Sequence, residues 1–427
     1  MDFRENMRVT ILGLWHLGCV TAACCAERFQ VQGLDVDADL VAQLKQGKPP
    51  ISEPGLEELL QAGVRKGTLS FSSDLEHVCA ETDLLWVCFD TPVDDEDRAD
   101  VEFVLSRLRR CLSHLPAGAI VLISSQMPVG TCKSLSVDFP QFSFACSPEN
   151  LQLGRALDAF RKPERIIVGA RDDATGKKLQ SLLGHFSTNL LMMNPESAEM
   201  VKHALNSFLA LSVSFINEIA RVCELVGADA RQVEAGLKSD IRIGRRAYLS
   251  PGPAFAGGTL ARDVAMLTHL GKEFGEKLVL IPAIKQSNDQ HKDWAVLKLQ
   301  RLLADARGKT IAVLGLTYKP FTDTLRRSSS VELCRRLVAQ SCMVRAFDPA
   351  VKKLDMAGVM LCPSAAEALA GTDAAVLATP WPEFRNLDWA MATQRMRRPL
   401  LLDPHGFVQE QVRPATKIEY HTVGVSL

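Results

Sequence analysis

The first 36 residues carry the pattern that most restricts how this chain can fold. Residues 8–12 are a short apolar run rich in β-branched side chains, and the run ends at Gly13. The turn G-L-W-H-L-G (13–18) then leads into a helical stretch, and a second strand at 31–36 contains Asp35. A strand, a glycine turn, a helix and a second strand that ends in an acid form the unit of a dinucleotide-binding parallel sheet. The pattern therefore predicts an α/β domain.

The same unit predicts the cofactor. The pyrophosphate of a dinucleotide would lie at the N-terminus of the helix, and Asp35 would bind the ribose hydroxyls. A carboxylate there repels a 2′-phosphate, so NAD is favoured over NADP. The candidate cofactor residues of the turn are Gly13, Trp15, His16, Leu17 and Gly18.

Trp15 departs from the usual G-x-G-x-x-G turn, because it replaces the glycine that normally allows the pyrophosphate to approach the backbone. The indole must point away, or the dinucleotide must shift, or no dinucleotide binds. A βαβ unit without any ligand is the structural alternative.

Further apolar runs alternate with helical segments and extend the first domain to about residue 192. They are 84–92, 119–125, 142–150 and 165–169. Strands that alternate with helices imply a parallel sheet, and ligands gather at the carboxyl ends of such strands. Thr91, Gln126 and Glu149 each follow one of these ends, so we expect them near the cofactor or the substrate.

A long helix is predicted from residue 196 to about residue 237. Lys202 and Asn206 are four residues apart, so they share one helix face and could both approach an anionic oxygen. A surface pair at a helix end is the alternative. A long helix between two sheet domains is a natural dimer contact, and we expect a homodimer.

The C-terminal part repeats the first pattern. The stretch G-K-T-I-A-V-L-G-L-T-Y-K-P (308–320) is again a strand and a glycine turn, and further strands are predicted at 344–349, 374–380 and 399–404. The predicted fold is α/β, with two Rossmann-like doubly wound domains joined by a long central helix or helical domain. The expected boundaries are 1–192, 193–294 and 295–427.

A loop rich in glycine and proline precedes the second domain. It reads Y-L-S-P-G-P-A-F-A-G-G-T-L-A-R-D (248–263). Gly257 and Gly258 let backbone N–H groups approach a ligand, and a helix expected to open at Arg262 and Asp263 would favour an anion or a reacting oxygen. An ordinary connection between helices is the alternative.

Composition excludes some classes of partner. The chain has 49 basic and 50 acidic residues and a net charge of −1, so we expect neither nucleic acid nor an anionic membrane as a partner. The sequence contains no run of 18 apolar residues, so no membrane span is expected. The 12 cysteines follow no disulfide or metal-ligand spacing, which favours buried thiols in the reducing cytoplasm and no metal site.

The order of these motifs resembles the UDP-glucose/GDP-mannose dehydrogenase family over nearly the whole chain. The resemblance rests on I-S-E-P-G-L-E-E-L-L (51–60), S-P-E-N-L (147–151), V-K-H-A-L-N-S-F (201–208), S-F-I-N-E-I-A (214–220), R-I-G (242–244), P-G-P-A-F-A-G-G-T-L-A-R-D (251–263) and L-G-L-T-Y-K-P-F-T-D-T-L-R-R-S (314–328). It implies oxidation of the C6 alcohol of a nucleotide sugar, with a UDP-sugar favoured, to a carboxylate with two NAD molecules, in a dimer formed through the central helix.

The resemblance also implies roles for individual residues. Glu149 would be an acid/base, while Lys202 and Asn206 would bind the substrate and stabilise an oxyanion. Asp263 would position a water or act as a base. Arg242 would reach the substrate, across the dimer. The remaining implied contacts are Thr91, Gln126 and Arg262 with the cofactor, and Tyr248, Phe255, Gly257, Lys319 and Arg326 with the nucleotide sugar.

The sequence departs from the family at the nucleophile. The family pattern G-F-G-G-S-C-F-x-K-D has a cysteine where this chain has Thr259, and a lysine where it has Arg262. A threonine hydroxyl is a much poorer nucleophile than a thiolate. Ala254, Ala256, Gln126 and His405 also differ from the family pattern.

These departures predict a two-electron oxidation, in which the alcohol becomes an aldehyde or a ketone. Three alternatives stay open: the full four-electron oxidation to a uronate, a non-catalytic or partner-dependent nucleotide-sugar-binding relative, and the use of the fold on a non-sugar hydroxyl.

Overall fold

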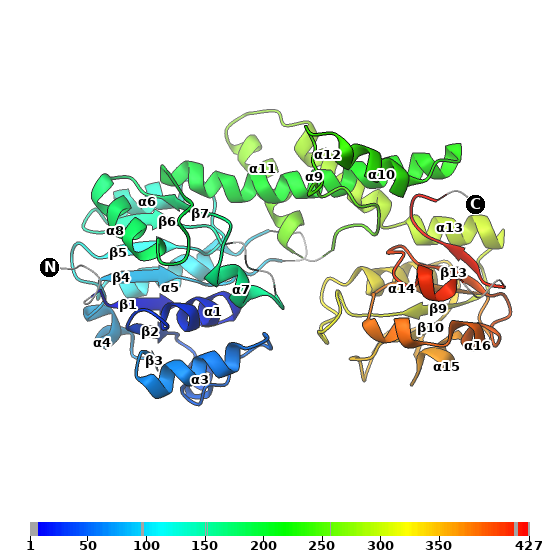
Figure 1. The fold of residues 1–427 in the computed structure, drawn as a ribbon, viewed down its shortest axis with the longest axis horizontal. Helices are drawn as coiled ribbons and strands as arrows, with labels where there is room; N and C mark the ends of the chain where they lie inside the picture. The colour runs from blue at the N-terminus through cyan, green and yellow to red at the C-terminus, as the bar shows by residue number, and fades with distance from the viewer. Residues whose placement is uncertain are drawn as a thin grey trace. The chain divides into compact units, whose positions relative to one another are not determined.

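The computed structural model describes residues 7–94, 98–149, 151, 153–256, 258–413 and 417–425. The chain divides into two compact units, Met1–Ala204 (unit 1) and Leu205–Leu427 (unit 2). Each unit contains a sheet with helices on both faces (Figure 1). The unit boundary falls inside the long helix α9 (Pro195–Val226).

Unit 1 is built on a sheet in which eight strands are described. The strand order is β3-β2-β1-β4-β5-β6-β7-β8, and every neighbouring pair is parallel except β6 and β7. The strands are β1 (Val9–Leu12), β2 (Val31–Leu34), β3 (Leu69–Ser72), β4 (Leu84–Val87), β5 (Ile120–Ile123), β6 (Ser143–Cys146), β7 (Ile166–Gly169) and β8 (Leu190–Met193). The antiparallel β7 differs from the all-parallel sheet that the sequence predicts.

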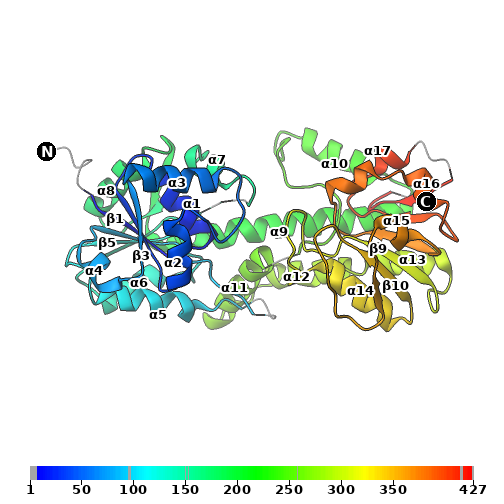
Figure 2. The same cartoon turned by 90° about the horizontal axis from the view of Figure 1, so that it is seen from below.

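Helices cover both faces of this sheet, as Figure 2 shows. The core on one face is formed with α1 (His16–Cys25), α2 (Ala38–Lys45), α3 (Leu56–Lys66), α7 (Ala156–Arg161) and α8 (Asp173–Leu183). The core on the other face is formed with α4 (Leu75–Ala80), α5 (Val101–Leu112) and α6 (Thr131–Asp138). Strands β1, β4 and β5 are fully buried because they are covered on both sides, which explains their continuous apolar sequence.

Unit 2 has a sheet of six described strands in the order β11-β10-β9-β12-β13-β14, and every neighbouring pair is parallel. The strands are β9 (Thr310–Leu314), β10 (Met343–Phe347), β11 (Val359–Leu361), β12 (Ala374–Leu377), β13 (Leu400–Leu402) and β14 (Glu419–His421). Numbered within each sheet, both units have the doubly wound order 3-2-1-4-5-6, and unit 1 adds two further strands. The prediction of two Rossmann-like units joined through a long helix is therefore confirmed.

The helices of unit 2 fall into two groups. The sheet is packed by α13 (Trp294–Leu303) and α14 (Ser329–Ala339) on one face and by α15 (Ala365–Leu369), α16 (Trp389–Thr393) and α17 (Gln409–Val412) on the other. A short 3₁₀ helix, η1, spans Pro382–Asn386. A small separate core joins α9 to α11 (Thr259–Glu273) and α12 (Leu280–His291).

The long predicted helix is two helices. The helix α9 ends at Val226, and Gly227 follows with φ of 77°. This left-handed conformation suits glycine and ends a helix. The next helix, α10 (Ala230–Ser239), begins after Asp229, whose side chain accepts a hydrogen bond from the N–H of Arg231.

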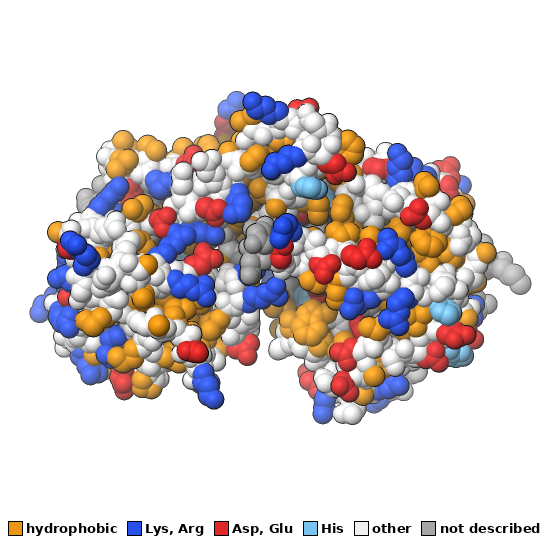
Figure 3. Space-filling model, turned by 180° about the vertical axis from the view of Figure 1, so that it is seen from behind, with side chains coloured by type: hydrophobic (Ala, Val, Ile, Leu, Met, Phe, Trp, Pro, Cys, Tyr) orange, Lys and Arg blue, Asp and Glu red, His pale blue; other side chains and the backbone are white. Residues whose placement is uncertain are grey.

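The surface carries charges of both signs, and the cysteine thiols lie in the interior. On the face drawn in Figure 3, basic and acidic side chains are interspersed. All 12 cysteines are buried and free. Among the described residues, each helix is either too short or too polar to cross a bilayer.

Candidate active site

The glycine turn after β1 is shaped by close approach of the backbone. Gly13 has φ of 91°, and a Cβ atom there would lie 2.5 Å from the ring of Phe89. A Cβ atom at Gly18 would lie 1.7 Å from the carbonyl oxygen of Gly13. Both positions therefore require glycine. Trp15 precedes α1, and its side chain is half exposed.

Asp35 supports this turn from the end of β2. It is buried, and its Oδ2 accepts a hydrogen bond of 2.8 Å from the N–H of Leu14. Its Oδ1 accepts one from the N–H of Asp37 at 3.1 Å. The turn, the start of the ten-residue helix α1 and this carboxylate lie at the point where the strand order reverses between β1 and β4, where dinucleotides bind in such sheets. The residues therefore fit NAD.

Replacing Gly18 with alanine is expected to weaken NAD binding at least tenfold, or by about 1.4 kcal/mol. The new Cβ would overlap the carbonyl of Gly13, so the turn that faces the pyrophosphate must change shape. Titration calorimetry with NAD measures the effect. Gly236→Ala on α10 is the matched control, because open space surrounds Gly236. Equal NAD affinity in folded Gly18→Ala and wild-type protein would contradict the expectation.

Next to the turn, Glu53 joins two segments that are far apart in the sequence. Its Oε2 lies 2.9 Å from Nε2 of His16, and the carboxylate accepts the N–H groups of Gly154 at 2.8 Å and Ala156 at 2.9 Å. Its side chain is 1% exposed. Burial raises the pKa of Glu53, but these hydrogen bonds outweigh burial and hold the pKa below its usual value. Glu53 thus links the start of α1 to the start of α7.

At the carboxyl ends of the strands of unit 1, predicted site residues meet in two pairs. The Oγ1 of Thr91 donates to the carbonyl of Gln126 at 2.8 Å. The Nζ of Lys202 donates to the carbonyl of Glu149 at 2.5 Å and lies 3.8 Å from Oε1 of the same residue. The side chain of Lys202 is 11% exposed and that of Glu149 is 31% exposed, so water reaches the carboxylate more readily than the amine.

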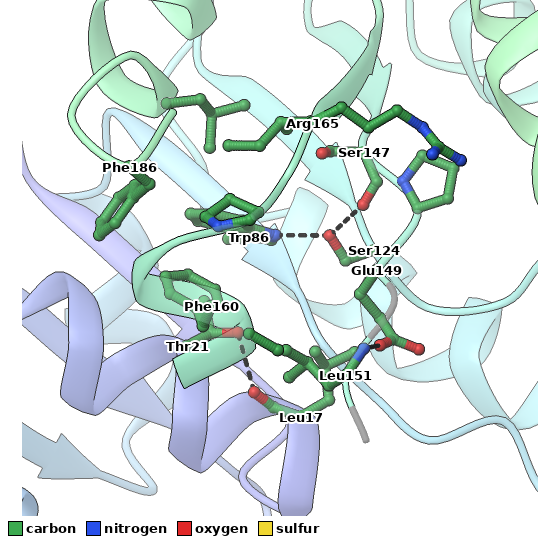
Figure 4. A pocket seen from close by; sticks show the side chains of 15 residues that line it. Leu17, Thr21, Trp86, Ser124, Ser147, Glu149, Leu151, Phe160, Arg165 and Phe186 are labelled. Carbon is green, nitrogen blue, oxygen red and sulfur yellow. Dashed lines mark hydrogen bonds between the residues drawn. The ribbon is translucent and has the colours of Figure 1, made fainter. Parts of the chain in front are cut away.

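A cavity of about 90 Å³ opens beside Glu149 (Figure 4). A chain of hydrogen bonds runs along one wall, from Nε1 of Trp86 to Oγ of Ser124 at 2.8 Å and from that hydroxyl to the carbonyl of Ser147 at 2.6 Å. The side chain of Glu149 accepts the N–H of Leu151. These bonds hold the ends of β4, β5 and β6 together around the carboxylate.

In unit 2, Asn206 and Asp263 form a buried pair. The Nδ2 of Asn206 on α9 donates to Oδ2 of Asp263 on α11 at 2.5 Å, and Asp263 is fully buried. The helix α11 begins at Thr259, three residues before the predicted start at Arg262. As the first residue of α11, Thr259 lies at the positive end of the helix dipole, and its side chain is exposed. Arg262 lies within the first turns of the helix. Gly257 lies outside the described residues.

The other predicted substrate residues of unit 2 have local contacts. The exposed guanidinium of Arg242 pairs with Asp240 at 2.6 Å. The Nζ of Lys319 lies 5.4 Å from the ring centroid of Tyr318. Tyr248 and Arg326 are exposed, and Phe255 is half buried.

Three family models together match most of the chain. They describe the UDP-glucose/GDP-mannose dehydrogenase family and match its NAD binding domain at 7–187, its central domain at 196–290 and its UDP binding domain at 312–410. The chain belongs to this family. It is an NAD-dependent nucleotide-sugar dehydrogenase that acts on a CH–OH group, as the sequence predicts.

Individual relatives align over almost their whole length. A UDP-glucose 6-dehydrogenase of Bacillus subtilis is 31% identical, with 98% of each chain covered. One of Pseudomonas aeruginosa is 33% identical, with 93% of each covered. The solved structure of a UDP-glucose dehydrogenase from the archaeon Pyrobaculum islandicum is 30% identical, with a TM-score of 0.88, and covers 100% of this chain and 99% of that one.

His291 is a buried residue that the sequence analysis did not predict as part of the site. His291 is 3% exposed; its Nε2 lies 2.7 Å from the carbonyl of Gly252, and its Nδ1 lies 3.1 Å from a guanidinium nitrogen of Arg221. A carbonyl only accepts and a guanidinium only donates, so the neutral Nε2–H tautomer satisfies both. Burial and, to a smaller extent, the nearby Arg221 lower the pKa of His291 to about 4, while the hydrogen bond to Gly252 and the charge of Glu224 oppose them.

The low pKa of His291 predicts that the folded protein loses stability in acid. Its pKa in the folded state is lower than its value of about 6.5 in the unfolded state, so the unfolded state binds the proton first. Stability is therefore expected to fall as the pH drops from 6.5 to 4, by about 3 kcal/mol in total. Urea unfolding at pH 7 and pH 4.5 measures this loss. His291→Gln should lose less stability over the same interval, and an equal loss in both proteins would count against the assignment.

Proposed function

We propose that this enzyme oxidises an alcohol carbon of a nucleotide sugar, with a UDP-sugar favoured, and that it removes a single pair of electrons. The contact of Lys202 with Glu149 is the observation that carries the proposal. It places an amine and a carboxylate at the carboxyl ends of the unit 1 strands, at the edge where the NAD-binding turn also lies. The match to the family's UDP binding domain supports a nucleotide sugar as the substrate.

The chain's own groups supply the proton chemistry. Bound NAD would accept the hydride from the alcohol carbon. The hydroxyl proton would pass to Glu149 or, through a water, to Asp263. The ammonium of Lys202 and the amide of Asn206 would donate hydrogen bonds to the oxygen as its negative charge develops. Asn206 already donates to the buried Asp263, which fixes the orientation of its amide. Thr91 and Gln126 would contact the cofactor.

We further propose that Thr259 occupies the place of the family cysteine and ends the reaction at the aldehyde. A thiolate can add to an aldehyde and give a thiohemiacetal that loses a second hydride. A threonine hydroxyl stays protonated near neutral pH, and Thr259 is exposed. Since no covalent adduct forms, the two-electron product would leave the enzyme.

Stoichiometry tests both proposals. The purified protein is incubated with NAD and separate UDP-, GDP- and dTDP-sugars, and NADH is counted per sugar consumed. We expect one NADH and an aldehyde or ketone product with at least one UDP-sugar. Two NADH per sugar together with a uronate would refute the two-electron proposal. No turnover of any nucleotide sugar would refute the proposed substrate class.

We also propose that the chain forms a homodimer through α9. Phe208, Phe215 and Val222 recur every seven residues on this helix and are all exposed, at 64%, 45% and 53%. Such a spacing gives one continuous apolar stripe, and Leu225 and Val226 extend it. Arg242 would then reach the partner's substrate. Light scattering on Phe215→Glu is expected to show a monomer, and a wild-type monomer would refute the proposal.

We propose that the chain has three parts, divided at residues 192 and 294, and that the protein is located in the cytoplasm. The family models, which end and begin at 187, 196, 290 and 312, support the first. The 12 free, buried thiols support the second.

A further inference from the structure

The loop before α11 is held by side chains instead of by secondary structure. Residues 249–256 form neither helix nor strand, so their backbone polar groups need other partners. Within unit 2 these partners come from two helices, α9 and α12.

Asn288 on α12 binds both backbone groups of Phe255. Its Oδ1 accepts the N–H of Phe255 at 2.9 Å, and its Nδ2 donates to the carbonyl of Phe255 at 3.0 Å. Asn288 is 3% exposed. A side-chain amide offers a donor and an acceptor side by side, so it can pair with one residue much as a neighbouring strand would.

Asn217 on α9 makes the same kind of contact earlier in the loop. Its Oδ1 accepts the N–H of Gly252 at 3.0 Å, and its Nδ2 donates to the carbonyl of Pro253 at 3.2 Å. Asn217 is 1% exposed. The carbonyl of Gly252 accepts a hydrogen bond from Nε2 of His291.

Five backbone groups of the loop are therefore satisfied by three buried side chains. Leaving a buried polar group without a partner costs about 1–3 kcal/mol, so the loop cannot leave this conformation without a penalty. The Phe255 ring adds an apolar anchor, because it packs on the small core of Ala210, Val264 and Ile284. Thr259 follows only four residues after Phe255.

We propose that Asn217 and Asn288 are positioning residues that fix the loop leading to Thr259, and that they thereby set the affinity for the nucleotide sugar. This inference rests on the proposed function, in which Phe255 contacts the sugar nucleotide. NAD binds to unit 1, so its binding should not depend on these two asparagines.

Asn288→Asp tests the inference with little change in shape. The variant keeps an oxygen for the N–H of Phe255 but loses the donor to its carbonyl. We expect the KM for the nucleotide sugar to rise at least tenfold, while the KM for NAD changes less than twofold. Gln286→Glu is the matched control, because it makes the same amide-to-acid change at an exposed position of the same helix. The control should leave both constants unchanged.

Hydrogen exchange gives a readout that needs no substrate. In ligand-free protein, the amides of Gly252 and Phe255 are expected to exchange at least tenfold faster in Asn217→Ala and Asn288→Ala, respectively, than in wild type, because each variant removes the oxygen that accepts the N–H. Unchanged protection in either folded variant, or equal rises in the KM for sugar and for NAD, would overturn the inference. If wild-type protein turns over no nucleotide sugar, the proposed function fails, and exchange alone still decides whether the asparagines fix the loop.

Discussion

Replacing Thr259 with cysteine is expected to double the NADH released per nucleotide sugar, from one to two. Thr259 is the exposed first residue of α11, a helix of 15 residues. Helix N-termini lower the pKa of a cysteine thiol below its usual value of about 8.5, so the new side chain would be partly thiolate at neutral pH. It would add to the aldehyde carbon, and the thiohemiacetal carbon would lose a second hydride.

The second half of that reaction needs a second NAD, which would take the hydride, and one molecule of water. Loss of the hydride gives a thioester, and water releases the carboxylate and restores the thiol. NADH absorbance and mass spectrometry of the product measure the change from aldehyde to uronate. Thr259→Ser is the matched control and should still release one NADH, because it keeps a hydroxyl. A folded, active Thr259→Cys enzyme that releases one NADH per sugar would show that the nucleophile does not limit the reaction.

Replacing Glu224 with glutamine is expected to destabilise unit 2 by about 3–5 kcal/mol. Glu224 and Lys298 form an ion pair of 2.9 Å, and their side chains are only 6% and 5% exposed. Glu224 also accepts Nε1 of Trp294 at 2.7 Å and the N–H of Gly424 at 2.9 Å. The neutral variant would leave the ammonium of Lys298 buried without a counter-charge.

Urea unfolding followed by circular dichroism measures this loss. Asp305→Asn is the matched control, because Asp305 pairs with Arg307 at an exposed site where such a change should have little effect on stability. The double variant Glu224→Gln/Lys298→Met should recover part of the lost stability, because it removes both buried charges. A loss in Glu224→Gln no larger than in the control would contradict the expected desolvation effect.

The strands that the sequence predicts are the central strands of both sheets, and those that it misses lie at the edges. In unit 1 the missed strands are β3 and β8, and in unit 2 they are β11 and β14. Central strands are covered on both faces, so their sequences are continuous apolar runs such as L-L-W-V in β4. The edge strands β3 (L-S-F-S) and β14 (E-Y-H) are interrupted by polar residues. The edge strands β8 (L-L-M-M) and β11 (V-M-L) are apolar but only four and three residues long, and both are partly exposed.

Some residues of the candidate site could likewise be predicted from the sequence, and others could not. Glu149, Lys202 and Asn206 could be selected from the sequence, because each stands in a short motif or at a fixed helical spacing. Glu53 and Asn288 could not be given roles, because their partners are remote: Glu53 binds Gly154 and Asn288 binds Phe255, 101 and 33 residues away. Glu53 lies in the motif I-S-E-P-G, which contributed to the family resemblance but indicated neither a role nor a partner for this residue.

The sequence by itself determined the doubly wound class, the NAD-binding turn and the family, because these depend on local apolar periodicity and on glycines and acids at fixed spacing. Only the tertiary structure decided that α9 ends at Val226, that β7 runs antiparallel, and which buried side chains hold the loops of the site. Hydrogen bonds across long stretches of chain form only after the sheets and helices have packed. Their partners therefore leave no periodic signal in the sequence.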